Sequence, residues 1–148
     1  MSNLSLNRGE PKVGDRAVEA SNLSPLVVGA RLVFKAIAWI FAICILIQVF
    51  LAGLALFWNS AQWASHAGFS RLLIIVPILM LVVTFVARLP LSLRLRSAGL
   101  IGIIILIVVS AKLPSGIGYL SALHPVLAFM LLGATISIAR KTQALAKA

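Results

Sequence analysis

Four long runs of apolar residues, separated by short polar or basic segments, set the narrowest limits on the fold of this chain. The runs cover residues 32–58, 66–87, 97–113 and 119–139. A helix of about 17–25 residues crosses a hydrocarbon core of roughly 30 Å, so each run is long enough to be a span. The runs lack the alternation typical of membrane β-strands. The sequence therefore predicts an all-α integral membrane protein, an up-down four-helix transmembrane bundle with a lipid bilayer around it.

The composition agrees with lipid as the solvent for most of the chain. Hydrophobic residues make up 61% of the 148 residues, and the mean hydropathy is +1.11. Soluble domains contain about 45–50% apolar residues, and a soluble fold this apolar would expose large patches and aggregate. All three acidic residues lie in the polar segment 1–25, which we expect to be a disordered tail before one transmembrane domain over 26–148.

Proline and glycine predict where the spans bend and end. Pro77 lies inside the second run, where it removes one backbone hydrogen bond, so we expect a kink there. Pro90 marks the end of that run, and the stretch 114–118 holds a proline and two glycines that predict a turn.

The basic residues predict an orientation. In the up-down arrangement, eleven of the 13 fall on the side of the two termini: Arg8, Lys12, Arg16, Arg31, Lys35, Arg88, Arg94, Arg96, Arg140, Lys141 and Lys147. Only Arg71 and Lys112 fall on the other side. The positive-inside rule then places both termini on the cytoplasmic side of a bacterial inner membrane. Because topology explains the net charge of +10, we expect no nucleic-acid partner.

Two histidines give the sharpest functional prediction. His66 and His124 open the second and fourth spans, which are diagonal in an up-down bundle, and ionisable residues in a span indicate function. Two imidazoles that face each other can supply both axial ligands of a haem b. Arg71 and Lys112 lie where the propionates of an outward-pointing haem would need partners. Gln48, the one strongly polar residue at mid-depth in the first span, is predicted to hydrogen-bond either a ligand or a neighbouring helix.

A structural or interfacial role is the alternative for both histidines. His66 lies at the expected water interface, and His124 precedes Pro125, a residue favoured in a first helical turn. Arg88 follows His66 by 22 residues and Arg140 follows His124 by 16, which at about 1.5 Å per residue is an offset in depth of roughly 9 Å. The offset disappears only if the first two spans extend further into the cytoplasm.

The residues that are missing exclude several functions. No Asp or Glu lies in any span, so proton-coupled transport has no buried carboxylate. The single cysteine, Cys44, excludes dithiol chemistry, and two histidines without a carboxylate or thiolate fall short of a zinc site. No motif of a hydrolase or phosphotransferase is present. A channel or transporter for a small neutral or apolar solute stays an alternative, although no pore-lining polar stripe indicates one. The main alternative to a haem protein is a cofactor-free accessory subunit of a larger membrane complex or of a homo-oligomer.

Two stretches together resemble a known type of protein. Residues 48–54, followed by 63–68, and the stretch 122–126 around His124 resemble an uncharacterised family of small four-span bacterial membrane proteins. The resemblance covers about residues 32–139, and it implies a four-helix bundle and no established activity.

More distantly, the layout is similar to one half of a haem A synthase, in which helices 2 and 4 each bring a histidine to a haem. This resemblance implies His66 and His124 as the ligands. That family has a glutamate three residues before its helix 2 histidine, where this chain has Trp63, and pairs cysteines in an outer loop, where this chain has none. These differences argue against the same catalysis and leave haem binding open.

Overall fold

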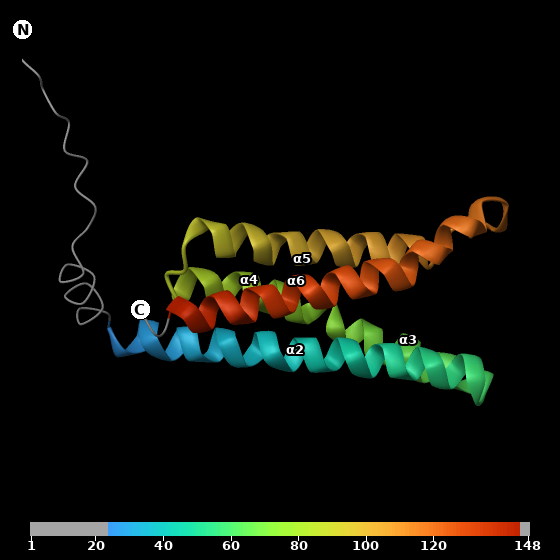
Figure 1. The fold of residues 1–148 in the computed structure, drawn as a ribbon, viewed down its shortest axis with the longest axis horizontal. Helices are drawn as coiled ribbons and strands as arrows, with labels where there is room; N and C mark the ends of the chain where they lie inside the picture. Colours follow the sequence, from blue (N-terminus) through green and yellow to red (C-terminus); the bar gives the residue numbers. More distant parts are fainter. Residues whose placement is uncertain (1–23, 146–148) are drawn as a thin grey trace, which may run out of the picture.

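Four helical segments run up and down the length of the molecule (Figure 1). The structure, a computed structural model, describes residues 24–145, so the predicted tail lies almost wholly outside the described residues. The elements are α2 (Pro25–Phe57), η1 (Ser60–Gln62), α3 (Trp63–Leu73), α4 (Ile75–Val86), α5 (Leu91–Ser110), η2 (Ser115–Ala122) and α6 (Leu123–Leu145). The prediction of an all-helical chain is confirmed over these residues.

The second and fourth segments combine several elements. Pro25–Phe57, Ser60–Val86, Leu91–Ser110 and Gly116–Ala144 are each long and apolar enough to cross a membrane. Helix α2 packs against α6, α6 against α5, α5 against α4, and α4 against α2. This order places α4 diagonally opposite α6 and is the up-down arrangement that the sequence predicts.

The core of the bundle is a column of buried apolar side chains. Phe34, Ala38 and Phe41 follow a helical spacing on the inner face of α2 and are fully buried. Leu100 of α5 and Ile138 of α6 belong to the same cluster. Large apolar side chains also cover the outside of every helix, a pattern typical of helices that face lipid rather than water.

The helices extend beyond the apolar runs that predict them. Helix α2 begins at Pro25, seven residues before the expected start, because proline is compatible with the first helical position. Helix α6 continues past Arg140 and Lys141 to Leu145, since arginine and lysine favour helix nearly as well as leucine does. The bundle is therefore longer than the hydropathy pattern alone indicates.

The second segment is interrupted one turn before Pro77. Helix α3 ends at Leu73 and α4 starts at Ile75. Pro77 has no N–H to donate to the carbonyl of Leu73, four residues earlier, so the regular ladder fails there. After this break the chain changes neighbours: α3 packs on α2, whereas α4 packs on both α2 and α5 (Figure 1).

A left-handed residue closes α4. Arg88 has a φ of 48°, and the N–H of Leu89 donates to the carbonyl of Thr84 at 3.0 Å, the pattern of a Schellman C-cap. Arg31 Nε of α2 donates to the carbonyl of Ala87 at 3.2 Å. The last carbonyls of α4 therefore accept hydrogen bonds from the turn itself and from Arg31 of α2. The positive charge of Arg31 also interacts favourably with the negative end of the helix dipole.

We expect Arg88→Gly to stabilise the fold by about 1 kcal/mol, because glycine adopts positive φ without the cost that a side chain adds. The measurement is the free energy of unfolding of the detergent-solubilised protein titrated with a denaturing detergent. Arg96→Gly is the matched control: Arg96 is exposed inside α5, so this change removes the same charge and should destabilise by roughly 0.5–1 kcal/mol. Equal destabilisation by both changes would contradict the role of the turn.

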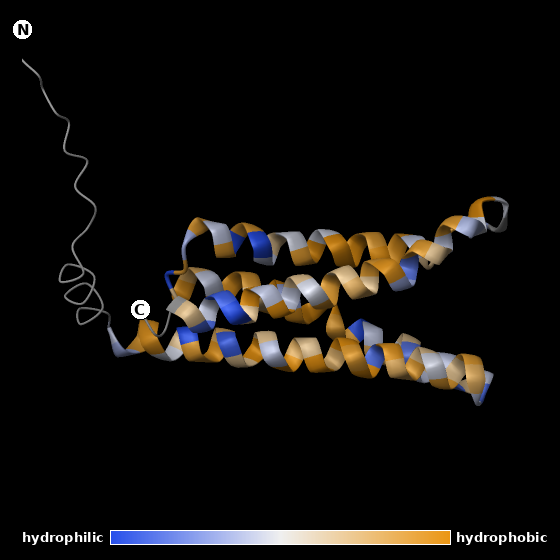
Figure 2. Cartoon of the chain, viewed as in Figure 1, coloured by the Kyte–Doolittle hydropathy of each residue, from blue (hydrophilic) through white to orange (hydrophobic). Residues whose placement is uncertain are grey.

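Seven of the nine charged side chains of the described part gather at one end. Helix α2 begins there, α6 ends there, and the turn between α4 and α5 lies there (Figure 2). Seven cations belong to these segments: Arg31, Lys35, Arg88, Arg94, Arg96, Arg140 and Lys141. The opposite end holds the two histidines and the remaining cations of the described residues.

Candidate functional site

A cavity separates two helix pairs at the end of the bundle away from the start of α2 and the end of α6. Helix α3 packs on α2, and α5 packs on α6, whereas within residues 24–145 no Cα atom of α3 comes within 8 Å of a Cα atom of α5 or α6. The pairs diverge toward this end (Figure 1). The cavity between them has a volume of about 490 Å³, within the roughly 300–1,000 Å³ of small-molecule sites. All five predicted site residues line it: Gln48, His66, Arg71, Lys112 and His124.

The other walls of the cavity are mainly apolar. Phe41 and Ile45 contribute from α2, Ile74 from the junction of α3 and α4, Ile104 from α5 and Leu131 from α6. A few polar groups set in an apolar chamber are typical of sites that orient a largely hydrophobic ligand.

His66 is fixed by a reciprocal pair of hydrogen bonds with Gln48. Its Nδ1 lies 3.1 Å from the backbone carbonyl of Gln48, and Gln48 Nε2 donates to the backbone carbonyl of His66 at 2.8 Å. Trp63 packs edge-on against the imidazole, with ring centroids 5.5 Å apart. Because a carbonyl oxygen only accepts, Nδ1 carries the proton and Nε2 keeps its lone pair.

His124 is held in the same way from the opposite wall. Its Nδ1 lies 3.1 Å from the backbone carbonyl of Ile107 on α5. Ser110 Oγ is also within reach, at 3.4 Å, but this hydroxyl donates to the same carbonyl at 2.8 Å. Nδ1 of His124 is therefore the donor, and Nε2 is again left free to bind a ligand.

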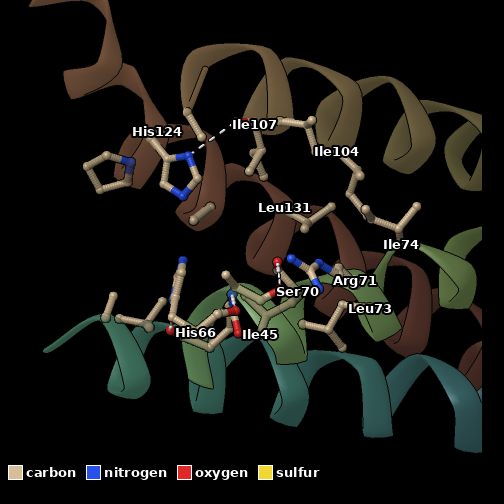
Figure 3. A pocket seen from close by; sticks show the side chains of 18 of the residues that line it. Ile45, His66, Ser70, Arg71, Leu73, Ile74, Ile104, Ile107, His124 and Leu131 are labelled. Carbon is tan, nitrogen blue, oxygen red and sulfur yellow. Dashed lines mark hydrogen bonds between the residues drawn. The ribbon is translucent and has the colours of Figure 1, made fainter. Parts of the chain in front are cut away.

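The two imidazoles meet across the cavity. Figure 3 shows the rings of His66 and His124 pointing toward one another from α3 and α6. Their centroids lie 6.3 Å apart and their planes are inclined by 54°. A metal–imidazole bond of about 2.0–2.1 Å, with the nitrogen about 1.1 Å from its ring centre, corresponds to a centroid separation of about 6.3 Å across a linear N–metal–N unit. The pair is thus spaced as two axial ligands of one metal would be.

The sequence predicts a difference in depth of roughly 9 Å between His66 and His124. The structure does not show this difference, because the two ring centroids are only 6.3 Å apart. The count took Arg140 as the cytoplasmic end of the last span, but α6 continues to Leu145. The residues of α6 after Arg140 supply the helix length that the count left out.

The two cations lie on opposite sides of the histidine pair. Arg71 follows His66 by five residues on α3, about 7.5 Å further into the bundle at 1.5 Å per residue, and its side chain lies between α3 and α6 (Figure 3). Lys112 follows the end of α5, five residues past Ile107 in the outward direction. The sequence interpretation placed both cations beside outward-pointing propionates, whereas the structure puts only Lys112 at the outer mouth.

Sequence reasoning missed the groups that orient the imidazoles. The acceptors are the backbone carbonyls of Gln48 and Ile107, and backbone groups leave no signal in residue type. The side chain of Gln48 was identified, but as a partner for a ligand or another helix in general. In the structure its Nε2 supports His66, and its Oε1 is buried with no hydrogen-bond partner among the described residues.

Comparison with protein families gives a match over residues 48–115 to a family of unknown function, DUF6220. The match covers the last third of α2 together with α3, α4 and α5, and it includes His66 but not His124. It agrees with the predicted resemblance to an uncharacterised family and assigns no activity. Comparisons with curated proteins and with solved structures found no match.

Proposed function

We propose that this chain is an integral protein of a bacterial inner membrane that binds one haem b through His66 and His124, for electron transfer or sensing. The observation that carries the proposal is the facing pair of imidazoles, 6.3 Å apart between centroids. Each has its Nδ1 bound to a backbone carbonyl, so each can offer Nε2 to a metal. Hydrogen bonds of this kind commonly hold metal-binding histidines.

A porphyrin suits this site better than a bare metal ion. Within residues 24–145 no group of three or more His, Cys, Asp or Glu gathers, whereas zinc takes three or four protein ligands. Iron in a porphyrin needs only two axial ligands, which the histidines can supply. The apolar walls and the volume of about 490 Å³ also favour a large, mainly hydrophobic cofactor.

The ligand set also bears on the reaction class. Two histidine ligands would leave no open position on the iron, which favours electron transfer or sensing over the binding and activation of O₂. The similarity in layout to one half of a haem A synthase stays a prediction, and the proposal does not depend on it.

The proposed location follows from hydropathy and charge. Four segments are apolar enough to span a membrane, and their basic residues favour the cytoplasmic side for the end that carries both termini. This orientation would place the histidines near the outer face of the membrane. A single cysteine added at Gly116, an exposed position of η2, in a Cys44→Ser background should be labelled by a membrane-impermeant thiol reagent in intact spheroplasts. Labelling only after lysis would contradict the orientation.

The direct test is the absorption spectrum of the full chain. The protein is expressed with a haem precursor in the medium, purified in mild detergent and titrated with hemin. We expect a Soret band, the α band of a low-spin b-type haem after reduction, and one haem per chain. A chain that binds no hemin would contradict the proposal and favour the cofactor-free accessory subunit.

Gln48→Leu should weaken hemin binding by about 10–100-fold, the usual effect of removing a group that supports a metal ligand. The change removes the hydrogen bond to the His66 carbonyl and leaves both imidazoles in place. Gln143→Leu makes the same chemical change near the opposite end of the bundle and should leave the hemin Kd unchanged. Equal hemin Kd values for the two variants would show that Gln48 does not support His66 as an iron ligand.

A further inference from the structure

Arg71 is a cation in the apolar part of the cavity without an acidic neighbour. It lines the cavity together with Leu73 and Ile74, and its side chain lies between α3 and α6 (Figure 3). Residues 24–145 contain no Asp or Glu, so no side chain of the described part can neutralise it. Arg71 is exposed rather than packed among side chains of the described part, and at membrane depth a guanidinium that faces a cavity or lipid is costly unless an anion meets it.

The other polar side chains that line the cavity near Arg71 offer it no anion, since the one unpaired acceptor among them in the described residues, Oε1 of Gln48, is uncharged. Ser70 Oγ donates to the carbonyl of Ala67 at 2.9 Å, and Gln48 Nε2 donates to His66. Among the cavity-lining residues of the described part, free cationic donors remain at Arg71 and Lys112. Both side chains are exposed, but they lie at different depths. Lys112 follows the end of α5, where its ammonium can extend to water or lipid headgroups, whereas Arg71 lies within α3, on the inner side of the histidine pair. Arg71 is therefore the cation of the described cavity wall that most needs an anionic partner from a ligand.

We propose that Arg71 binds a carboxylate of the ligand held by the two histidines, so that the acidic edge of the porphyrin faces into the bundle and not out past Lys112. This inference rests on the proposed haem site. Arg71 lies about 7.5 Å along α3 from His66, on the inner side of the histidine pair. A guanidinium matches a carboxylate through two parallel hydrogen bonds, which an ammonium cannot reproduce.

The proposal predicts a preference between two porphyrins that differ only in their acid groups. Hemin carries two free carboxylates, and hemin dimethyl ester carries none, while the iron and the ring are the same. In the unmodified chain the free acid should bind about 10–100-fold more tightly, the range expected for a hydrogen bond to a charged group.

The experiment titrates both porphyrins into the detergent-solubilised full chain and into four variants. Arg71→Gln should reduce the preference to nearly one by weakening hemin alone, and unchanged ester binding would show that the variant is folded. Arg71→Lys should keep part of the preference, because it retains the charge and loses the paired geometry. Lys112→Gln tests the competing cation, and Arg96→Gln removes one charge at the opposite end and should behave as the unmodified chain.

Two results would overturn the inference while leaving the haem site intact. One is equal affinity of the unmodified chain for hemin and its ester. The other is loss of the preference in Lys112→Gln but not in Arg71→Gln, which would turn the acidic edge outward. If neither porphyrin binds the unmodified chain, the proposed function fails, and this inference fails with it.

Discussion

Alanine in place of either His66 or His124 is expected to abolish haem binding. Loss of a supporting group already weakens metal affinity by about 10–100-fold, so loss of a coordinating nitrogen should cost more than about 100-fold. The imidazoles approach from α3 and α6, and neither described wall offers a second histidine to replace the one removed. The measurement is the Soret absorbance per chain after purification, with the hemin Kd from titration.

Chemical rescue separates lost coordination from lost folding. Adding free imidazole to the His66→Ala or His124→Ala protein should restore a low-spin spectrum, because the small molecule can occupy the space that the side chain leaves. Ser65→Ala, at an exposed position beside His66, should keep the full Soret band. A normal band in both histidine variants would show that hemin binds elsewhere.

Phenylalanine at position 128 is expected to block the cavity without touching either histidine. Ala128 lies one turn after His124 on α6 and lines the cavity. An aromatic ring there would occupy the space that the ligand needs, so hemin binding should weaken by about 100-fold or more, as fits a steric penalty of a few kcal/mol. Thermal stability should not fall, because the new ring enters open volume and not a packed core.

Ala98→Phe is the matched control for this change. Ala98 is exposed on α5 and does not line the cavity, so the same added volume faces outward there. Hemin affinity should match that of the unmodified chain. If Ala128→Phe also binds hemin normally, the ligand lies outside this cavity, whatever the histidines do.

Hydropathy was enough to predict four helices, and the up-down arrangement was enough to predict that α2 begins at the end of the bundle where α6 ends. Helix ends were harder to predict. Helix α2 starts at Pro25, because proline is compatible with the first helical position. Helix α6 reaches Leu145, because helix formation continues through polar residues after hydropathy falls. Pro77 was a reliable signal, since a missing N–H acts on the carbonyl four residues earlier in any helix.

The histidine pair could be predicted because diagonal helices in an up-down bundle bring the same ends together. The facing geometry could not, because it depends on the backbone carbonyls of Gln48 and Ile107 and on the divergence of α3 from α5 and α6. The different depths of Arg71 and Lys112 along the bundle could have been predicted from the sequence. Each is displaced from the histidine level by about five residues, in opposite directions along the bundle.

The most direct test of the histidine pair uses the fact that the chain contains only two histidines. Growth on ¹⁵N-histidine labels those two side chains alone, and electron–nuclear double resonance of the hemin-loaded ferric protein reads the nitrogens bound to iron. We predict a low-spin ferric signal with strong coupling to two ¹⁵N nuclei, one from each imidazole. A high-spin signal, or coupling to a single ¹⁵N, would contradict axial ligation by His66 and His124.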